Sequence, residues 1–569
     1  MQNIFGNEDK IEVFSKLQQK LRLLEPHSSD EKLNELLNSI PPDYLTQKDD
    51  LKVICELFAL YSRSTIISTK SNFIKLFEKI MQPIKTYLQN ESYFFWNIFG
   101  GIYYFKLWMY REGLITIDQI IQFCQKTTMK HMIEYFTPEI IEKVPEIYDK
   151  EIKYLIDKPL SKEYIEDLKE VRKKHFNWLR NSSDFNDQIY EEIEKESIRL
   201  AIKRDDIDSF QKIISNTNLP INSRIRESMI ENFLRFDEET TLIEYAIQFN
   251  SIKIFQFLVM NDVTLDDSMI WSSVFSNNYE IVHFLENRFN ALFPSICFCN
   301  SISCWNDEIN EYILNNYSEF DFFQQSEVEL KDNDILLDIV RETIYYLNFS
   351  FFEKILIPFF KQNQKIVDDN INIFLLFSTS ENSCFFLPNL LKHPKCDVNY
   401  FYQKVQYSIV GGSMIEGNLK AFEMIVNNPE FDVNGPCNRA FSPLIFACGC
   451  HCDMKIVEMI FNHPKLKENI KNSFRMAAMK GNFYALQYLV DNSDNAYTDN
   501  FFLILFFTCL CDHHLLILKI ILKLYLKLNK QTNCDDLIEE IDSNFSNNPN
   551  YRNDFNEDFK KIYEELTNM

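Results

Sequence analysis

The residue types in this chain best suited to chemistry are cysteine and histidine, which gather at three places. The groups are Cys448, Cys450, His451 and Cys452; Cys297, Cys299 and Cys304; and Cys509, Cys511, His513 and His514. Thiolate and imidazole are zinc ligands, and zinc usually takes four of them from paired C-x2-4-C units separated by a loop. None of the groups has that pairing, and free cysteine also packs as a small apolar residue. We therefore interpret these residues as packing residues and expect no metal site.

A metal- or redox-responsive protein that uses these residues is the alternative function. On a helix, Cys448 and Cys452 share a face while Cys450 points away, so one group alone does not close a site. Two groups brought together by folding would make one. Zinc bound to the purified protein would support this alternative.

Sequence signatures of enzymes are missing. The stretch from Gly412 to Asn418 has the two glycines of a phosphate loop but lacks the lysine and the hydroxyl residue that reach phosphate and metal, so we interpret it as a helix and its turn. No G-x-S-x-G, H-E-x-x-H or kinase motif is present, and His283 suits a hydrogen-bonded helix face better than a catalytic base. We expect a non-enzymatic protein without catalytic or cofactor-binding residues. An enzyme hidden in the N-terminal region would need a polar pocket with convergent ionisable groups.

One short segment recurs at a fixed step of 35 residues. Its three copies run from Lys392 to Asn399, from Asn427 to Asn434 and from Asn462 to Asn469, and each has proline at its third position. A period of this length indicates a stacked array, because one short unit cannot bury its apolar face without a neighbour. Arrays of this kind usually bind other molecules and seldom catalyse reactions.

The first 190 residues show helical periodicity without a repeat. Apolar residues at i, i+3, i+4 steps predict a buried helix face made of Leu51, Ile54, Leu57, Phe58 and Tyr61. Ser28 and Glu31 have the spacing of a capping box and predict a helix start at Ser28. Proline is predicted to end or bend a helix at Pro83 and to break the chain at Pro138.

Three segments, at residues 241–259, 442–460 and 476–490, share a turn, a short helix and a second apolar helix. The second begins Ser-Pro-Leu-Ile-Phe-Ala at Ser442, and the third has an A-A-x-x-G step that ends at Gly481. These segments resemble ankyrin repeats, with their T-P-L-H-x-A first helix and I-V-x-x-L-L second helix. Asn250 stands at the turn glycine of the first segment, where asparagine tolerates left-handed backbone. The histidine of T-P-L-H is replaced by Glu244 or Ile445.

The resemblance is to divergent ankyrin-repeat proteins with an N-terminal helical domain of unassigned function, which are abundant in unicellular eukaryotes. It implies an all-α fold with an N-terminal helical domain at 1–190, an ankyrin-type α-solenoid at 191–528 and an acidic C-terminal tail at 529–569. It also implies a protein-binding scaffold or adaptor that uses the concave solenoid surface, without assigning partner-binding residues. The tail is interpreted as solvated, with a docking peptide as the alternative.

Composition restricts the class of partner. The net charge of −24 disfavours nucleic acid and anionic membranes and favours a basic protein partner. The 14 cysteines do not form a disulfide framework and no signal peptide is evident, so we expect a reducing, cytoplasmic location. Two apolar runs, 93–110 and 501–511, are interpreted as buried helices rather than membrane spans, because the first contains Asn97 and Lys106 and the second is too short.

Overall fold

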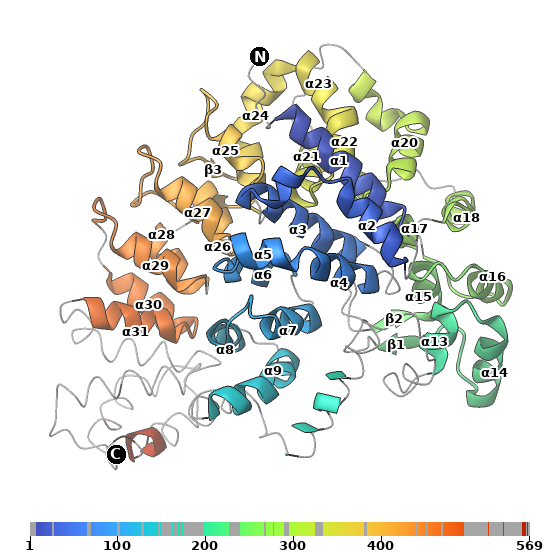
Figure 1. Cartoon of the computed structure of the whole chain (residues 1–569), viewed down its shortest axis with the longest axis horizontal. Helices are drawn as coiled ribbons and strands as arrows, with labels where there is room; N and C mark the ends of the chain where they lie inside the picture. Colours follow the sequence, from blue (N-terminus) through green and yellow to red (C-terminus); the bar gives the residue numbers. More distant parts are fainter. Residues whose placement is uncertain are drawn as a thin grey trace. The chain divides into compact units, whose positions relative to one another are not determined.

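The computed structural model of the full chain describes most residues from 7 to 493 (Figure 1). Within that range it leaves out 25–27, 65–69, 100–102, 127–129, 146–147, 149–161, 163–164, 167, 171, 174–196, 227–238, 267–268, 277, 290–294, 325–333, 381–383, 440, 451 and 468–469. Beyond residue 493 it describes 522, 539, 560–564 and 566. The described residues are mostly helical with a few short strands, so the predicted all-α class is confirmed.

The chain divides into two compact units. Unit 1 comprises residues 1–114 and 167–396, and unit 2 comprises residues 115–166 and 397–569. The domain boundaries predicted at 190 and 528, and nearly all of the predicted acidic tail, lie outside the described residues.

Unit 1 starts with a run of helices and continues with helix pairs. The run is α1 (Glu8–Arg22), α2 (Asp30–Asn38), η1 (Pro42–Leu45), α3 (Lys48–Ser64), α4 (Lys70–Lys79), α5 (Met81–Tyr87), α6 (Ser92–Ile98) and α7 (Tyr103–Arg111). The later elements are α13 (Ser197–Lys203), α14 (Ile207–Thr217), β1 (Arg224–Arg226), β2 (Glu239–Thr241), α15 (Leu242–Gln248), α16 (Ile252–Met260), α17 (Met269–Ser276), α18 (Tyr279–Phe289), α19 (Ser295–Ser303), α20 (Asp307–Asn316), η4 (Ser318–Gln324), α21 (Asp334–Tyr345), α22 (Phe349–Phe351), η5 (Phe352–Leu356), α23 (Ile357–Gln362), α24 (Gln364–Phe377) and α25 (Leu387–Leu390).

Unit 2 contains two helices from the N-terminal third and then further helix pairs. Its elements are α8 (Ile117–Lys126), α9 (Lys130–Lys143), β3 (Phe401–Tyr402), β4 (Tyr407–Ser408), α26 (Ile409–Ile415), α27 (Leu419–Val426), α28 (Pro443–Gly449), α29 (Met454–Phe461), α30 (Lys471–Met479) and α31 (Phe483–Asn492). Strands β3 and β4 pair antiparallel with Phe401 opposite Ser408, as β1 and β2 do in unit 1 with Arg224 opposite Thr241.

Aromatic side chains form the core of the N-terminal helices. Phe73 and Phe77 of α4 lie against Phe99, Phe105 and Trp108, with ring centroids 4.1 to 6.2 Å apart. All five are buried, and aromatic pairs in edge or tilted geometry contribute about 0.5–1.5 kcal/mol beyond the burial of their area. The predicted helix face is confirmed, because its members are all buried in α3: Leu51, Ile54, Leu57, Phe58 and Tyr61.

Helix α2 begins one residue later than the capping-box spacing predicts. Its N-cap is Ser29, whose side chain accepts from the backbone N–H of Lys32 at 3.4 Å. Ser28 is instead buried, and its backbone N–H donates to Oδ1 of Asn72 at 2.9 Å. Ser28 and Ser29 have the same side chain, so the spacing alone does not show which of them caps the helix.

The two prolines behave differently. Pro83 lies in the first turn of α5, after α4 has ended at Lys79, which confirms the predicted helix end. The break predicted at Pro138 is wrong, because α9 runs through it. Phe136 and Ile140 of the same helix are fully buried, and their packing offsets the hydrogen bond that the proline cannot make.

The helix pairs stack in chain order within each unit. In unit 1, α13 packs on α14, α15 on α16, α17 on α18 and α19 on α20, while the first members α15, α17, α19 and α21 contact one another in turn. In unit 2, the pairs are α26 with α27, α28 with α29 and α30 with α31, and both first and second helices contact those of the next pair (Figure 1). Each pair therefore buries its apolar side chains against its neighbours.

One turn recurs between the two helices of a pair. A residue with positive φ is followed by the residue that begins the second helix, whose N–H donates to the carbonyl five residues back at 2.8 or 2.9 Å. Asparagine and glycine adopt this backbone readily, which confirms the turn positions predicted for Asn250 and Gly481. The two-residue turns are Asp205-Asp206, Asn250-Ser251, Trp305-Asn306, Leu347-Asn348, Gly417-Asn418 and Gly481-Asn482.

The second residue of this turn also ties one pair to the pair before it. Asn348 accepts the N–H of Phe351 in its own helix at 2.9 Å and donates from Nδ2 to the carbonyl of Ile302 at 2.8 Å. Asn482 makes the same two kinds of bond, accepting from Ala485 and donating to Cys448 at 3.1 Å. Asn306 donates to Val274 and Ser251 to Ile202 in the same way. We call these buried residues the capping residues: Ser251, Asn306, Asn348 and Asn482.

Asparagines at the end of the 35-residue segment form a second set of bonds. Asn399 donates from Nδ2 to the carbonyl of Glu430 at 2.7 Å and accepts the N–H of Asp432 at 2.8 Å. Asn434 repeats both bonds, at 2.8 Å each, with the carbonyl of Lys465 and the N–H of Lys467. The sequence repeat is thus also a repeat of hydrogen bonds between successive segments.

We expect Asn434→Ala to destabilise unit 2. The substitution removes the hydrogen bonds to the carbonyl of Lys465 and the N–H of Lys467. Each neutral hydrogen bond contributes about 0.5–1.5 kcal/mol to stability. Thermal unfolding should show a lower Tm, and hydrogen exchange should show faster exchange at Lys467. The matched control is Asn427→Ala, an exposed asparagine whose side chain makes no hydrogen bond to any described residue. Equal loss of stability in both variants would contradict the role of Asn434.

The same segments predict a dependence of stability on pH. The Nδ1 atom of His463 accepts the N–H of Lys465 at 3.3 Å, as Oδ1 of Asn428 accepts the N–H of Glu430 one copy earlier. Burial, with Lys465 nearby, lowers the pKa of His463 below its ordinary value. As the pH falls below about 6.5, the unfolded chain is protonated first, so this part of the stability is lost with falling pH.

His463→Asn keeps the acceptor and removes the titration. Compared with wild type, its Tm should fall less between pH 7.5 and pH 5.5. An identical fall in both proteins would show that the neutral imidazole of His463 contributes nothing.

Candidate functional site

The first helix of each pair presents two residues, one helical turn apart, on one face. One lies seven residues and the other three residues before the residue that begins the second helix, as Glu244 and Gln248 do before Ser251. The two are four residues apart and therefore share a face of the first helix. Of these positions, Arg199, Ser303 and Gly411 are buried. The partly or fully exposed ones, which we call the first-helix face, are Lys203, Glu244, Gln248, Trp271, Cys299, Arg341 and Tyr345 in unit 1 and Ile415, Phe446, Cys450, Arg475 and Met479 in unit 2.

In unit 1 the first-helix face combines an aromatic side chain with charged ones. The side chain of Trp271 is 42% exposed although tryptophan is usually covered in folded proteins. Arg341 lies two pairs further along and forms surface ion pairs of 2.9 Å with Asp338 and 3.0 Å with Glu342. Exposed tryptophan and arginine are the residue types that dominate binding energy in protein interfaces.

In unit 2 the first-helix face is more apolar. Ile415 is 48% exposed, and Phe446 and Met479 are partly exposed at the matching positions. Gly411 is buried, and a Cβ atom there would lie 2.7 Å from the backbone carbonyl oxygen of Cys437, so no side chain fits at this position. The chain before α28 therefore covers α26 at this position.

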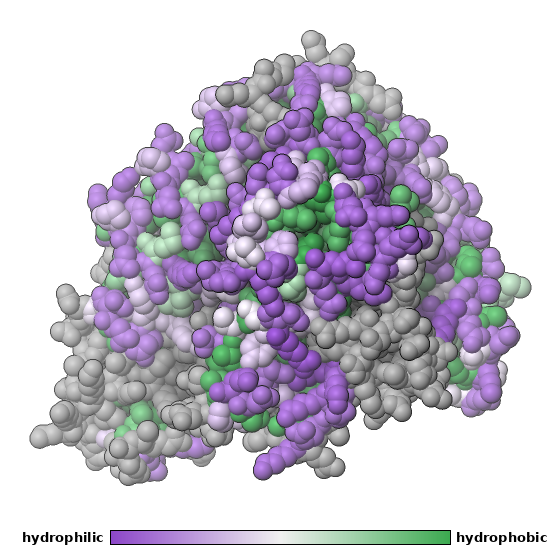
Figure 2. Space-filling model, viewed as in Figure 1, coloured by the Kyte–Doolittle hydropathy of each residue, from purple (hydrophilic) through white to green (hydrophobic). Residues whose placement is uncertain are grey.

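Hydrophilic residues cover most of the coloured surface in the view of Figure 2, and hydrophobic residues appear there in small areas. The exposed large apolar side chains in the pairs of unit 1 lie on three successive pairs rather than in one helix: Met260, Trp271, Phe284 and Ile296. Two of them are on first helices, Trp271 and Ile296, and two are on second helices, Met260 and Phe284.

The cysteines of the first two groups are mostly inside the helix pairs. Cys297, Cys448 and Cys452 are buried, and no disulfide joins the described cysteines. Cys452 donates weakly from Sγ to the carbonyl of Ala447 at 3.4 Å. Burial, with the nearby Glu342 and Asp338, raises the pKa of the Cys299 thiol to about 12. At neutral pH these conditions favour the neutral thiol over the thiolate that binds metal or attacks a disulfide.

No group of three or more His, Cys, Asp or Glu side chains in the described part of the chain is placed to hold a metal ion. His451 and the third group, Cys509, Cys511, His513 and His514, lie outside the described residues.

The glycines of the phosphate-loop-like stretch have structural roles. Gly412 is buried within α26, and Gly417 has a φ of +67° in the turn before Asn418. This arrangement confirms the interpretation of the stretch as a first helix and its turn.

A carboxylate with several donors lies on the second helices of unit 1. Glu286 accepts from the hydroxyls of Tyr312, at 3.0 and 3.1 Å, and of Tyr317, and its Oε2 lies 3.1 Å from Nδ1 of His283. Burial and the carboxylate raise the pKa values of both tyrosines above their ordinary value. His283 therefore has a hydrogen-bonding partner on the helix face, as its sequence position predicted. Glu286 ties α18 to α20 and the chain that follows α20.

No helix that the structure describes is long and apolar enough to span a membrane. The run 93–110 forms two short helices, α6 and α7, whereas the run 501–511 lies outside the described residues.

Comparison of the chain with models of protein families and with curated proteins finds no match.

Glu244 has a function that its sequence position did not suggest. It takes the position that the resemblance to ankyrin repeats assigns to a histidine. Its Oε2 accepts the N–H of Thr241 at 2.9 Å, and Oγ1 of Thr241 accepts the N–H of Glu244 at 3.3 Å. The two residues form a capping box at the start of α15. The Thr-x-x-Glu spacing is the signal that would have shown it.

The thiol of Cys299 should react slowly. With a pKa near 12, its thiolate fraction at pH 8 is about a thousandfold below that of an exposed cysteine. Iodoacetamide labelling followed by mass spectrometry should give a rate for Cys299 in the native protein far below the rate in urea. Equal rates in the native protein and in urea would show that the fold does not suppress the reactivity of the Cys299 thiol, and would favour the redox-responsive alternative.

Proposed function

We propose that this chain is a protein-binding scaffold or adaptor of the ankyrin-repeat type, which takes its partner on the first-helix face. The observation that carries the proposal is the recurring turn with its capping residue. In three pairs an asparagine accepts an N–H of its own helix and donates to the preceding pair: Asn306, Asn348 and Asn482. A stack joined in this way holds its exposed side chains at a fixed spacing. Variable side chains on a rigid repeated frame are the usual means by which repeat proteins recognise partners.

The chemistry of the first-helix face supports a protein as the partner. Its exposed members include Trp271, Arg341 and Tyr345 in unit 1, which offer apolar area, a planar cation and a phenol. Burying such groups in a partner's pockets gives most of the affinity of a typical interface. The net charge of −24 favours a basic partner by long-range attraction. The proposed location is the cytoplasm, because 14 cysteines without a disulfide framework suit a reducing compartment.

The function is tested with the tagged full chain as bait in a native lysate and mass spectrometry as the readout. Trp271→Ala combined with Arg341→Ala removes two exposed contacts of the first-helix face at little cost to the core. The matched control is Gln256→Ala, an exposed residue on the second helix α16. We expect a protein that wild type and control retain and the double variant loses. Calorimetry with that purified protein should then show at least about tenfold weaker binding, or about 1.4 kcal/mol.

The proposal fails if every retained protein is captured equally by the double variant and the control. Circular dichroism and Tm values equal to those of wild type would exclude unfolding as the cause of a loss.

A further inference from the structure

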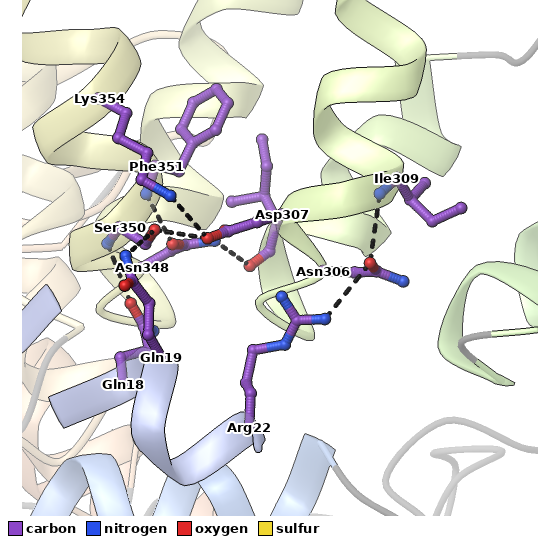
Figure 3. A network of polar contacts seen from close by, with 11 residues as sticks. Gln18, Gln19, Arg22, Asn306, Asp307, Ile309, Asn348, Ser350, Phe351 and Lys354 are labelled. Carbon is purple, nitrogen blue, oxygen red and sulfur yellow. Dashed lines mark hydrogen bonds and ion pairs between the residues drawn. The ribbon is translucent and has the colours of Figure 1, made fainter. Parts of the chain in front are cut away.

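The first helix of the chain lies across two successive turns of the helix pairs in unit 1, as Figure 3 shows. Gln18 donates from Nε2 to the carbonyl of Leu347 at 3.2 Å and accepts the N–H of Ser350 at 3.0 Å. One helical turn further on, Arg22 donates to Oδ1 of Asn306 at 3.4 Å. Helix α1 thus forms hydrogen bonds with the turns at Asn306 and Asn348, although more than 280 residues separate it from them along the chain.

Gln18 makes a bond that the stack itself makes in an earlier pair. Asp205 has positive φ in the turn between α13 and α14. Its carboxylate accepts the N–H groups of Lys253 and Ile254 at the start of α16, at 3.0 Å each. In the pair that precedes Asn348, the residue that matches Asp205 is Trp305, which also has positive φ. Its indole cannot accept a hydrogen bond and donates instead to the carbonyl of Tyr346 at 2.8 Å. Gln18 supplies the missing acceptor from outside the stack.

An apolar anchor accompanies the amide. Phe14 is fully buried, with its ring centroid 5.2 Å from that of Phe349 and 5.7 Å from that of Phe385. The buried residues of α1 cover nearly half of its circumference, and the exposed residues, such as Glu12, Lys16 and Lys20, lie on the other side; the buried ones are Ile11, Phe14, Ser15, Leu17, Gln18 and Leu21. This is the pattern of an amphipathic helix laid into a groove.

Polar contacts surround the anchor. Ser350 donates from Oγ to Oδ2 of Asp307 at 2.6 Å and accepts from Nε2 of Gln19 at 3.2 Å, and Lys354 pairs with the same carboxylate oxygen at 3.2 Å (Figure 3). Asp307 therefore joins the two turns to each other, and α1 joins both. The surface under α1 includes residues 306–307 and 347–351 and Phe385. Helix α1 also contacts α2 and α3, and the ring of Phe14 lies 5.5 Å from that of Tyr44.

Helix α1 carries its own end signals. Asn7 caps it by accepting the N–H of Asp9 at 2.9 Å, acidic residues occupy its first turn, and Lys20 and Arg22 occupy its last. These features stabilise a helix without help from tertiary packing. Leu23, directly after the helix, is 81% exposed.

We propose that the surface formed by residues 306–307, 347–351 and Phe385 is a binding site for an amphipathic helix, which α1 occupies within the same chain. The matching partner is a helix that presents an aromatic residue, an amide and an arginine at positions i, i+4 and i+8, as Phe14, Gln18 and Arg22 do. Such a helix binds when α1 leaves. The site is separate from the first-helix face, so it does not depend on the proposed function.

The test uses the full chain and a fluorescein-labelled peptide with the sequence of residues 7–24. In the wild-type chain α1 competes with the peptide, so only the fraction of molecules with an open site binds it. Phe14→Ala combined with Gln18→Leu in the full chain weakens the internal competitor, and fluorescence anisotropy should show at least about tenfold tighter peptide binding. Lys20→Ala, an exposed change on α1, should leave the affinity at the wild-type value.

A peptide that itself carries the Phe14→Ala and Gln18→Leu changes should not bind the double-variant chain. The proposal is overturned if the double variant keeps wild-type helical content and binds the unchanged peptide no better than wild type does. If the double variant does not fold, hydrogen exchange of the wild type decides. Exchange of α1 amides while α22 stays protected supports an exchangeable occupant, and exchange of α1 only together with α22 overturns it.

Discussion

The hydrogen bonds of the buried side chain that begins the second helix in four of the described pairs are the interaction on which the stack depends. A helix start leaves backbone N–H groups without partners, and the end of the preceding pair's first helix leaves carbonyls without partners. Asn348 satisfies one of each, at 2.9 Å and 2.8 Å, while itself fully buried. Asparagine suits this position because its amide carries an acceptor and donors on one short side chain. Ser251 makes only the bond to the preceding pair, from its hydroxyl to the carbonyl of Ile202, and Asp205 accepts the N–H groups at the start of α16.

This constraint determines what the rest of each pair can do. The capping residue fixes the turn, and the turn orients the first helix. Most of the residues seven and three positions earlier then lie at the surface. Those positions vary from Trp271 to Cys299 to Arg341 without disturbing the joint between pairs. The residues that join the pairs and the residues of the first-helix face are thus different, because the former begin the second helix and the latter lie on the first. Where the stack lacks a suitable side chain, as at Trp305, the N-terminal helix provides it through Gln18.

The sequence predicted best the features that repeat or are local. The 35-residue step located Asn399 and Asn434, whose side chains make matching bonds, and Asn250 was recognised as a turn residue because few residue types tolerate positive φ. It failed at Pro138, where burial of neighbouring residues outweighs a local preference. The contact between Gln18 and Ser350 had no sequence signal, since it joins a region without repeats to a distant turn. Trp305 was equally hidden, because a tryptophan with positive φ is not expected from its own preferences.

The most direct measurement is hydrogen exchange by mass spectrometry on Asn348→Ala. If the capping residue joins two pairs, exchange should become faster both in α22, which loses its cap, and in the pair of α19 and α20, which loses the bond at Ile302. Asn348→Ser, which introduces the residue type that Ser251 has at the matching position, should restore part of the protection in both. Faster exchange confined to α22 and the residues after it would show that Asn348 caps its own helix without joining the two pairs, which contradicts the account.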